Sequence, residues 1–298
     1  MTPNLHEIPD ISRLQELARQ VRLDIVDMLY KAGSGHLGGS LSATEIMVAL
    51  FFAQMRHNPK DACWPQRDRF VLSKGHAAPV YYAVLSRLGY FPREELFTLR
   101  QFGSSLQGHP DASCTPGVEV STGSLGQGLS VAVGMALADK LDGNNRRVYA
   151  LIGDGESQEG QIWEAAMAAA QMKLHNLIVF LDYNRCQVDG YINEIIELEP
   201  VVQKWQSFGW RVQQIDGNDL HQILSALEIA HATTGQPHMI VANTIKGKGI
   251  SYMENRLEWH SCGLTEKDYR LAMQELAAQG LARERRSSTG VRPQRPRP

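Results

Sequence analysis

Segments of two different kinds alternate along this chain, and the alternation constrains the fold more than any other feature. Residues 148–152 and 176–182 are apolar at nearly every position, as in strands that are buried on both faces of a parallel sheet. Residues 159–172, between them, are rich in alanine and have a helical pattern. A strand, a helix and a second strand form a βα unit. Repeated βα units predict an α/β fold with a mostly parallel central sheet and helices on both faces.

The rest of the sequence continues this pattern. Further strands are expected at residues 69–73, 211–215 and 238–244. Helices are expected at residues 11–32, 42–55, 77–88, 126–140 and 265–280, with one more between the last two strands. Ser42 and Glu45 have the spacing of a capping box, and Asp219 is a plausible helix cap. Because no repeat or linker interrupts residues 1–282, a single domain is the simplest organisation.

The charge distribution separates the body of the chain from its end. The net charge is −2, but the last sixteen residues carry six arginines against one glutamate, so residues 1–282 carry −7. An acidic body argues against a nucleic-acid-binding protein. The Pro/Arg-rich segment 283–298 predicts a disordered basic tail.

Location and redox state follow from features that the sequence lacks. It has no apolar run of the length that a membrane helix needs and no basic, then apolar, N-terminal signal. Its cysteines form no Cys-x-x-Cys pair, so neither a zinc site nor a disulfide framework is expected. These are Cys63, Cys114, Cys186 and Cys262. A reduced, cytoplasmic protein without a membrane partner is expected.

The segment GDGESQEG at residues 153–160 is the most informative one about what the chain binds. A strand enters a tight glycine turn and a helix follows, so backbone N–H groups there can receive a diphosphate. Asp154 ends this strand, and Asn184 ends the next one. Both side chains would lie at the carboxyl edge of the sheet, where open α/β folds bind ligands. Their oxygen atoms suit a hard divalent cation.

Gly-Asp-Gly at residues 153–155, followed by Asn184, resembles the thiamine diphosphate motif. The surrounding sequence resembles transketolases in particular. Six segments, in family order between about residues 10 and 265, carry the resemblance. They are GDGESQEGQIWEA, SGHLGGSLS (34–42), LSKGHA (72–77), QGHPD (107–111), STGSLGQGL (121–129) and EWH (258–260). The resemblance implies the thiamine-diphosphate-binding fold and transfer of a two-carbon ketol unit from a ketose phosphate to an aldose phosphate.

The resemblance also assigns roles to individual residues. It implies that Mg²⁺, or Ca²⁺ or Mn²⁺ in its place, is held by Asp154, Asn184 and the backbone carbonyl of Cys186. It assigns to thiamine diphosphate the residues His76, Gly123, Leu125, Gly155, Glu156, Asn184 and His260. It assigns to catalysis His36, His76, His109 and His260. Histidine suits such work because its proton affinity lies near neutral pH.

Two further expectations concern a partner. In transketolases, glutamates that match Glu159 and Glu164 form a relay at the subunit interface. An acidic turn that stabilises a helix N-terminus is the alternative for these two residues. The family's pyrimidine-binding domain, with its activating glutamate, has no match in this sequence. The resemblance therefore implies a separate subunit that carries this domain, in an α2β2 assembly.

Three other functions compete with this one. The α subunit of a 2-oxoacid dehydrogenase is also a split thiamine enzyme, but it lacks the histidines of SGH and GHPD. Deoxyxylulose-5-phosphate synthase is a long single chain without GHPD. A non-catalytic scaffold subunit would not need the intact Asp154, Asn184 and histidines. Central pentose phosphate metabolism is the first expectation, and branched or sulfonated sugars are open alternatives.

Overall fold

A five-stranded parallel sheet forms the centre of the molecule, and the computed structural model describes it within residues 10–288. The strands are β1 (Arg69–Leu72), β2 (Val148–Gly153), β3 (Leu177–Tyr183), β4 (Arg211–Asp216) and β5 (His238–Asn243). Their order is β1-β2-β3-β5-β4, and every neighbouring pair is parallel. All the carboxyl ends therefore meet at one edge of the sheet.

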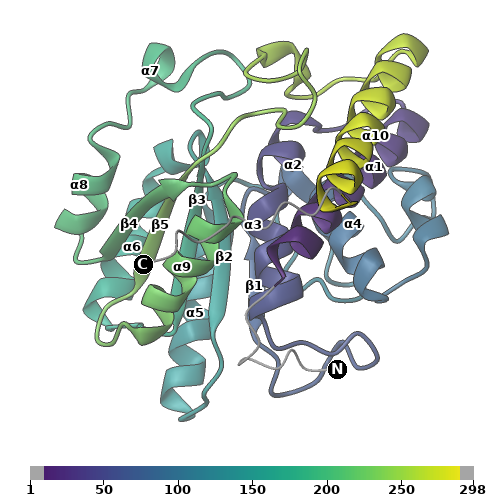
Figure 1. Ribbon diagram of the computed structural model, residues 1–298. Helices are drawn as coiled ribbons and strands as arrows, with labels where there is room; N and C mark the ends of the chain where they lie inside the picture. Colours follow the sequence, from purple (N-terminus) through teal and green to yellow (C-terminus); the bar gives the residue numbers. More distant parts are fainter. Residues whose placement is uncertain (1–9, 289–298) are drawn as a thin grey trace, which may run out of the picture.

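Helices cover both faces of this sheet and give two separate hydrophobic cores (Figure 1). One core contains α1 (Ile11–Ala32), α3 (Thr44–Ala49), α4 (Ala78–Leu88), α9 (Leu220–Ala232) and α10 (Glu266–Ser288). The other contains α5 (Gln127–Leu141), α6 (Gly160–Gln171) and α8 (Val201–Ser207). Short helices α2 (Gly38–Ser42) and α7 (Ile192–Ile195) complete the set. The predicted α/β class is confirmed.

All five predicted strands and most predicted helices form close to their expected bounds. Helix α1 occupies its predicted range, and glycine follows it in the left-handed conformation. Asp219 caps α9, since its side chain accepts a hydrogen bond from the backbone N–H of His221. Helices α7 and α8 were not predicted. None of the helices within residues 10–288 combines the length and apolar character needed to cross a membrane.

The predicted capping box at Ser42 is wrong. Instead of one helix over residues 42–55, the chain forms α2, α3 and a π-helical turn, Leu50–Gln54. The Ser42 hydroxyl donates to Asp182, and the Glu45 carboxylate pairs with Arg22. Both side chains are buried, so distant partners replace the local cap.

The end of the chain differs from the expectation at one point. Helix α10 continues to Ser288, six residues into the segment predicted as a tail. Residues 289–298 of that predicted tail lie outside the described residues.

Acid is expected to destabilise this fold through buried histidines at the amino edge of the sheet. His238, the first residue of β5, is fully buried and accepts a hydrogen bond from Gln213. Burial, followed by the charge of Arg211, lowers the pKa of His238 to about 4. The unfolded chain therefore binds more protons than the folded chain between about pH 6.5 and 4, and the free energy of unfolding falls as the pH drops through that window.

His238→Gln keeps an acceptor for Gln213 but does not titrate. Urea unfolding between pH 7 and pH 4.5 is expected to show a smaller loss of stability for this variant. The difference from the parent is expected to reach about 2.5 kcal/mol at pH 4.5. Parallel pH profiles for the parent and the variant would contradict the assignment.

Candidate active site

A cavity of about 370 Å³ lies at the carboxyl edge of the sheet and collects most of the predicted site residues. Loops that follow β1, β2, β3 and β5 line it, because parallel strands deliver their C-terminal loops to one edge. The predicted residues that line it are His36, His76, Gly123, Leu125, Asp154, Gly155, Glu156, Glu159, Asn184, Cys186 and His260. Segments separated by more than two hundred residues of sequence thus meet here.

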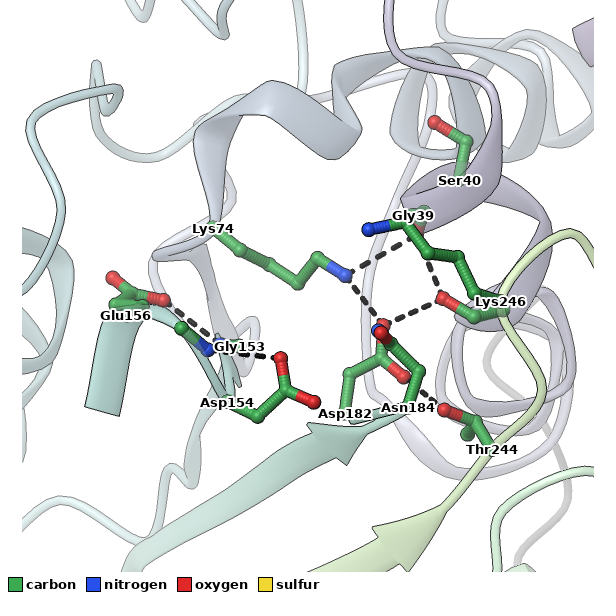
Figure 2. A network of polar contacts seen from close by, with 12 residues as sticks. Gly39, Ser40, Lys74, Gly153, Asp154, Glu156, Asp182, Asn184, Thr244 and Lys246 are labelled. Atoms are coloured by element: carbon green, nitrogen blue, oxygen red, sulfur yellow. Dashed lines mark hydrogen bonds and ion pairs between the residues drawn. The ribbon is translucent and has the colours of Figure 1, made fainter. Parts of the chain in front are cut away.

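A buried ion pair joins two of these loops, as Figure 2 shows. The ammonium of Lys74, after β1, meets the carboxylate of Asp182, near the end of β3, and both side chains are almost completely buried. The hydroxyls of Ser42, at 2.7 Å, and Thr244 also donate to this carboxylate. Burial acts to raise the pKa of Asp182, but Lys74 and the hydroxyl donors outweigh it, so the pKa is lowered. One carboxylate thus holds together the ends of β1, β3 and β5 and helix α2.

A second buried carboxylate fixes the glycine turn after β2. Glu156 accepts from the hydroxyl of Ser73 at 2.5 Å and from the backbone N–H groups of Gly126 and Gly153 at 2.9 Å each. Burial raises the pKa of Glu156, and these donors oppose that rise. The predicted cofactor contact of Glu156 stays a prediction. Its contacts within the protein tie the β2 turn to the β1 loop and to the start of α5.

The predicted metal ligands come together with suitable chemistry. Burial, and then the charge of Asp182, raise the pKa of Asp154 to about 7, so a cation beside this carboxylate would offset its cost of burial. The Asn184 side-chain oxygen accepts from the backbone N–H of Cys186 at 3.1 Å, which fixes the turn that carries both ligands. Carboxylate, amide and carbonyl oxygens form a donor set that fits Mg²⁺. No group of three acidic, histidine or cysteine side chains suitable for a metal occurs in the described part of the chain.

Basic groups also line the cavity, where a diphosphate would be favourable. The Lys246 ammonium is buried and donates to the Cys186 carbonyl at 2.9 Å, and it lies 2.7 Å from His260 Nδ1. Burial, and then Lys74, lower the pKa of Lys246 to about 8. A carbonyl oxygen has two lone pairs, so the Cys186 oxygen can serve both Lys246 and a metal.

The predicted catalytic histidines form one cluster. His36 lies at its centre, with ring centroids 5.3 Å from His76, 5.5 Å from His260 and 6.0 Å from His109. Burial is the first cause of a lowered pKa at all four, and it brings the pKa of His36 to about 4 and that of His260 to about 3. These rings are therefore neutral at pH 7 and can accept or donate hydrogen bonds.

The remaining predicted residues lie at the edge of the cavity or outside it. His109 is exposed and does not line the cavity, but a Cβ placed on Gly123 would lie 3.2 Å from its ring. Glu159 lines the cavity rim, whereas Glu164 is exposed on α6 and does not reach the cavity. The apolar residues Val131 and Met167 are also exposed, on α5 and α6.

Sequence reasoning missed Lys74, Asp182 and Lys246. The sequence did contain a signal for each of them. Lys74 and Asp182 stand two residues from the predicted His76 and Asn184, and Lys246 begins a Lys-Gly-Lys-Gly turn directly after β5. Charged residues adjoining strand ends of a parallel sheet are candidates for the same site.

Removing one partner of the Lys74–Asp182 pair is expected to lower the free energy of unfolding much more than removing both charges. Lys74→Met leaves the Asp182 carboxylate buried without a cation, so the free energy of unfolding should fall by about 3–5 kcal/mol. Lys74→Met combined with Asp182→Asn should recover part of that loss, because an amide keeps contacts to Ser42 and Thr244. Denaturant unfolding measures both.

Arg270→Met is the matched control, because Arg270 pairs with Glu266 on the surface and both side chains are more than half exposed. Its effect should stay within about 0.5 kcal/mol. A double variant less stable than the single one would show that the charge of Asp182 is not the cause.

Comparison with known proteins agrees with this geometry. The family model "Transketolase, thiamine diphosphate binding domain" matches residues 14–282. A 6-deoxy-6-sulfo-D-fructose transketolase subunit of Clostridium sp. (strain MSTE9) is 50% identical over 267 residues, which cover 90% of this chain and 97% of that protein. An apulose-4-phosphate transketolase subunit of Phocaeicola vulgatus is 42% identical, over 90% of this chain and 95% of that protein.

Solved structures give the same result. A transketolase of Pichia stipitis in complex with sedoheptulose 7-phosphate superposes with a TM-score of 0.86 at 34% identity, over 89% of this chain. The match covers 41% of that chain, so this protein corresponds to less than half of the Pichia transketolase. The family match, the identities and the fold agree: this chain belongs to the transketolase family and forms its thiamine diphosphate binding domain.

Proposed function

We propose that this chain is the thiamine-diphosphate-binding subunit of a two-subunit transketolase, which transfers a two-carbon ketol unit from a ketose phosphate to an aldose phosphate. The observation that carries the proposal is the cavity in which Asp154, Asn184 and the Cys186 backbone meet the histidines. The relatives named as transketolase subunits match this chain over 95% or more of their own length. A dehydrogenase α subunit or a scaffold would not require this cluster of histidines.

Asp154, Asn184 and the Cys186 carbonyl would hold Mg²⁺, and Lys74, Lys246 and His76 would face the diphosphate. The fit rests on charge, because buried ammonium groups gain from an anionic ligand and a buried carboxylate gains from a cation. Thiamine diphosphate, when bound, supplies the electron sink for breaking the carbon–carbon bond of the ketose. The other predicted cofactor residues line the same cavity and would also contact it: Gly123, Leu125, Gly155, Glu156 and His260.

The histidine cluster would donate protons to the sugar oxygens and accept protons from them. Neutral imidazoles at pH 7 can donate a hydrogen bond through one nitrogen and accept through the other. His36 lies centrally, within ring-to-ring distances of about 5–6 Å of the other three, so one sugar could contact several of them. His109, exposed at the rim, would meet the hydroxyl end of the donor.

The partner would be a subunit that carries the pyrimidine-binding domain and its activating glutamate, in an α2β2 complex. The word "subunit" in the names of relatives that this chain matches over 95% or more of their length supports this proposal. A cytoplasmic location and a place in central pentose phosphate metabolism belong to the same proposal.

Reconstitution tests the function. The chain alone is expected to show no ketol transfer, and addition of the partner subunit should restore it with thiamine diphosphate and Mg²⁺ present. Asp154→Asn should lower the activity of the complex at least 100-fold, because it removes the charged ligand, with weaker Mg²⁺-dependent cofactor binding in calorimetry.

Glu228→Gln on α9 is the control, because Glu228 is exposed and does not line the cavity. Full activity of the isolated chain would contradict the two-subunit proposal. Unchanged turnover in the Asp154→Asn complex would favour a scaffold subunit instead.

Glu159 and Glu164 are proposed to connect two cofactor sites through an interface. Their position beside the exposed apolar residues of α5 and α6 supports this proposal. Glu164→Gln removes only a charge at the exposed end of the proposed relay. It should therefore leave the affinity for the first cofactor molecule within about threefold and change the affinity for the second. A calorimetric titration of the complex measures both steps, and identical two-step curves for the parent and the variant would contradict the relay.

A further inference from the structure

A second cavity, of about 730 Å³, lies at the carboxyl edge of the sheet beside the cavity that contains the histidines. We call the new one the outer cavity and the other the inner cavity. The last residues of β3 and β5, the segment around α7 and the loop that carries Asn255 line the outer cavity. It has about twice the volume of the inner cavity, and the proposed function gives it no role.

The turn at residues 184–186 is a wall that the two cavities share. Asn184 and Cys186 line both cavities, whereas Arg185 lines only the outer one. The backbone N–H of Arg185 donates to the carboxylate of Asp154 in the inner cavity. The Arg185 guanidinium lies over the ring of Tyr183, with its Cζ 5.2 Å from the ring centroid. Arg185 therefore contacts a proposed metal ligand through its backbone and faces the outer cavity with its side chain.

Two residues that line the outer cavity have an unfavourable backbone conformation. Arg185 has a φ of +64° and Asn255 a φ of +57°, in the left-handed region that residues other than glycine rarely adopt. They are two of four such residues in the described part of the chain. Strained residues concentrate at functional sites. Asn255 does not line the inner cavity, so the inner site alone does not account for both of them.

The outer cavity contains polar groups with unused hydrogen-bonding capacity. Within residues 10–288, the side-chain amides of Asn193 and Asn255 make no hydrogen bond. The hydroxyl of Tyr191 makes only a long contact, of 3.4 Å, to the backbone carbonyl of Asn255. The Arg185 guanidinium lies 3.5 Å from the side-chain oxygen of Asn243. Each free amide can both donate and accept, as a hydroxyl group of a ligand also can.

The charges of the lining disfavour a strongly charged ligand. The lining has one arginine, Arg185, against two glutamates, Glu197 and Glu199, so its net charge is −1. Both oxygens of Glu199 already accept hydrogen bonds, from the Tyr183 hydroxyl at 2.8 Å and the Val201 backbone N–H at 2.9 Å. A phosphate would therefore meet two carboxylates, and an ammonium group would meet the guanidinium.

We propose that the outer cavity binds a neutral polyhydroxylated molecule, a free sugar or polyol. Hydroxyl groups match the free amides and the phenol, and the partly exposed ring of Tyr191, with Ile192 and Ile245, offers an apolar surface for the C–H groups of such a ligand. A ligand that holds the Arg185 side chain also holds the turn that carries Asn184. Its binding therefore strengthens the binding of Mg²⁺ and thiamine diphosphate in the inner cavity.

A segment of the partner subunit is the competing occupant of the outer cavity. Several large apolar side chains around α7 are exposed, among them Val188 and Ile196, and another chain can cover such a surface. The free amides favour a small hydroxylated ligand, because an apolar segment would bury them without hydrogen-bond partners. Assembly measurements separate the two occupants.

The experiment titrates the full chain with three six-carbon compounds that have no carbonyl group and cannot act as ketol donors. They are sorbitol, 1,6-hexanediol, which keeps only two hydroxyls, and glucamine, in which an ammonium group replaces one hydroxyl of sorbitol. NMR titration should show saturable binding of sorbitol and none of hexanediol at the same concentrations. Glucamine should bind within about threefold of sorbitol, because the guanidinium offsets the attraction of the carboxylates.

Two variants assign the binding to the outer cavity. Asn193→Leu removes a free amide and should weaken sorbitol binding about 3- to 10-fold, the loss expected for one or two neutral hydrogen bonds. Tyr191→Ala removes the aromatic surface and should have an effect of similar size. Asn145→Leu is the matched control, because Asn145 is exposed in the loop before β2, at the opposite edge of the sheet. It should leave the affinity for sorbitol unchanged.

Calorimetry measures the coupling between the cavities. Saturating sorbitol should raise the affinity of the chain for thiamine diphosphate with Mg²⁺ about fivefold, and the bound cofactor should raise the affinity for sorbitol by the same factor, because coupling is reciprocal. At the same sorbitol concentration, the increase in cofactor affinity should be smaller in Asn193→Leu than in the parent.

Four outcomes would overturn the inference. Equal binding of sorbitol and hexanediol would exclude recognition of hydroxyl groups, and glucamine bound more than about tenfold tighter would show that the carboxylates select a cation. An unchanged sorbitol affinity in both variants would place the binding elsewhere. Absent sorbitol binding, with weaker association of Asn193→Leu with the partner subunit in sedimentation, would assign the outer cavity to the partner.

Equal cofactor affinity with and without sorbitol would refute the coupling. None of these measurements uses turnover, so a reconstituted complex without ketol transfer would refute the proposed function and leave this inference standing.

Discussion

The buried carboxylate of Asp182 is the contact on which the geometry of the site depends. It lies near the end of β3 and receives Lys74 from the β1 loop, Ser42 from α2 and Thr244 from beyond β5. A buried charge is tolerated only when it is paired and hydrogen-bonded, so none of these four elements can move independently. The loop with the proposed metal ligands Asn184 and Cys186 starts two residues later. Its position therefore follows from a network that contains none of its ligands.

Glu156 has the corresponding role for the loop after β2, which carries the proposed metal ligand Asp154. Its carboxylate joins the turn after β2 to Ser73 and to the first turn of α5. The two carboxylates thus anchor different loops, and Asp154 lies between them (Figure 2). This arrangement leaves Asp154 as a buried acid surrounded by rigid structure, with its pKa raised by burial and by Asp182. Rigidity of this kind preorganises a site for a cation.

Local patterns predicted the elements better than they predicted the contacts between them. Strands and long helices follow from short-range apolar periodicity, which is why β1 to β5 and α1 formed where expected. The resemblance to transketolases predicted the histidines and the metal ligands, and the structure brings most of these residues into one cavity. Neither approach could identify Asp182 as the partner of Lys74, because the pair is separated by more than a hundred residues. Ser42 fails as a helix cap because it is the last residue of α2, and its hydroxyl donates to the distant carboxylate of Asp182.

The two ends of the strands in the parallel sheet have different roles. The carboxyl ends carry the site, whereas the amino end of β5 carries the buried His238 beside Arg211. Tolerance to acid and catalytic specificity can therefore change by separate routes during evolution. Substitutions at the amino edge can adapt the protein to a more acidic compartment while the loops at the carboxyl edge stay the same. The converse also holds, because exposed residues of the carboxyl-edge loops can change while His238 and its neighbours stay the same.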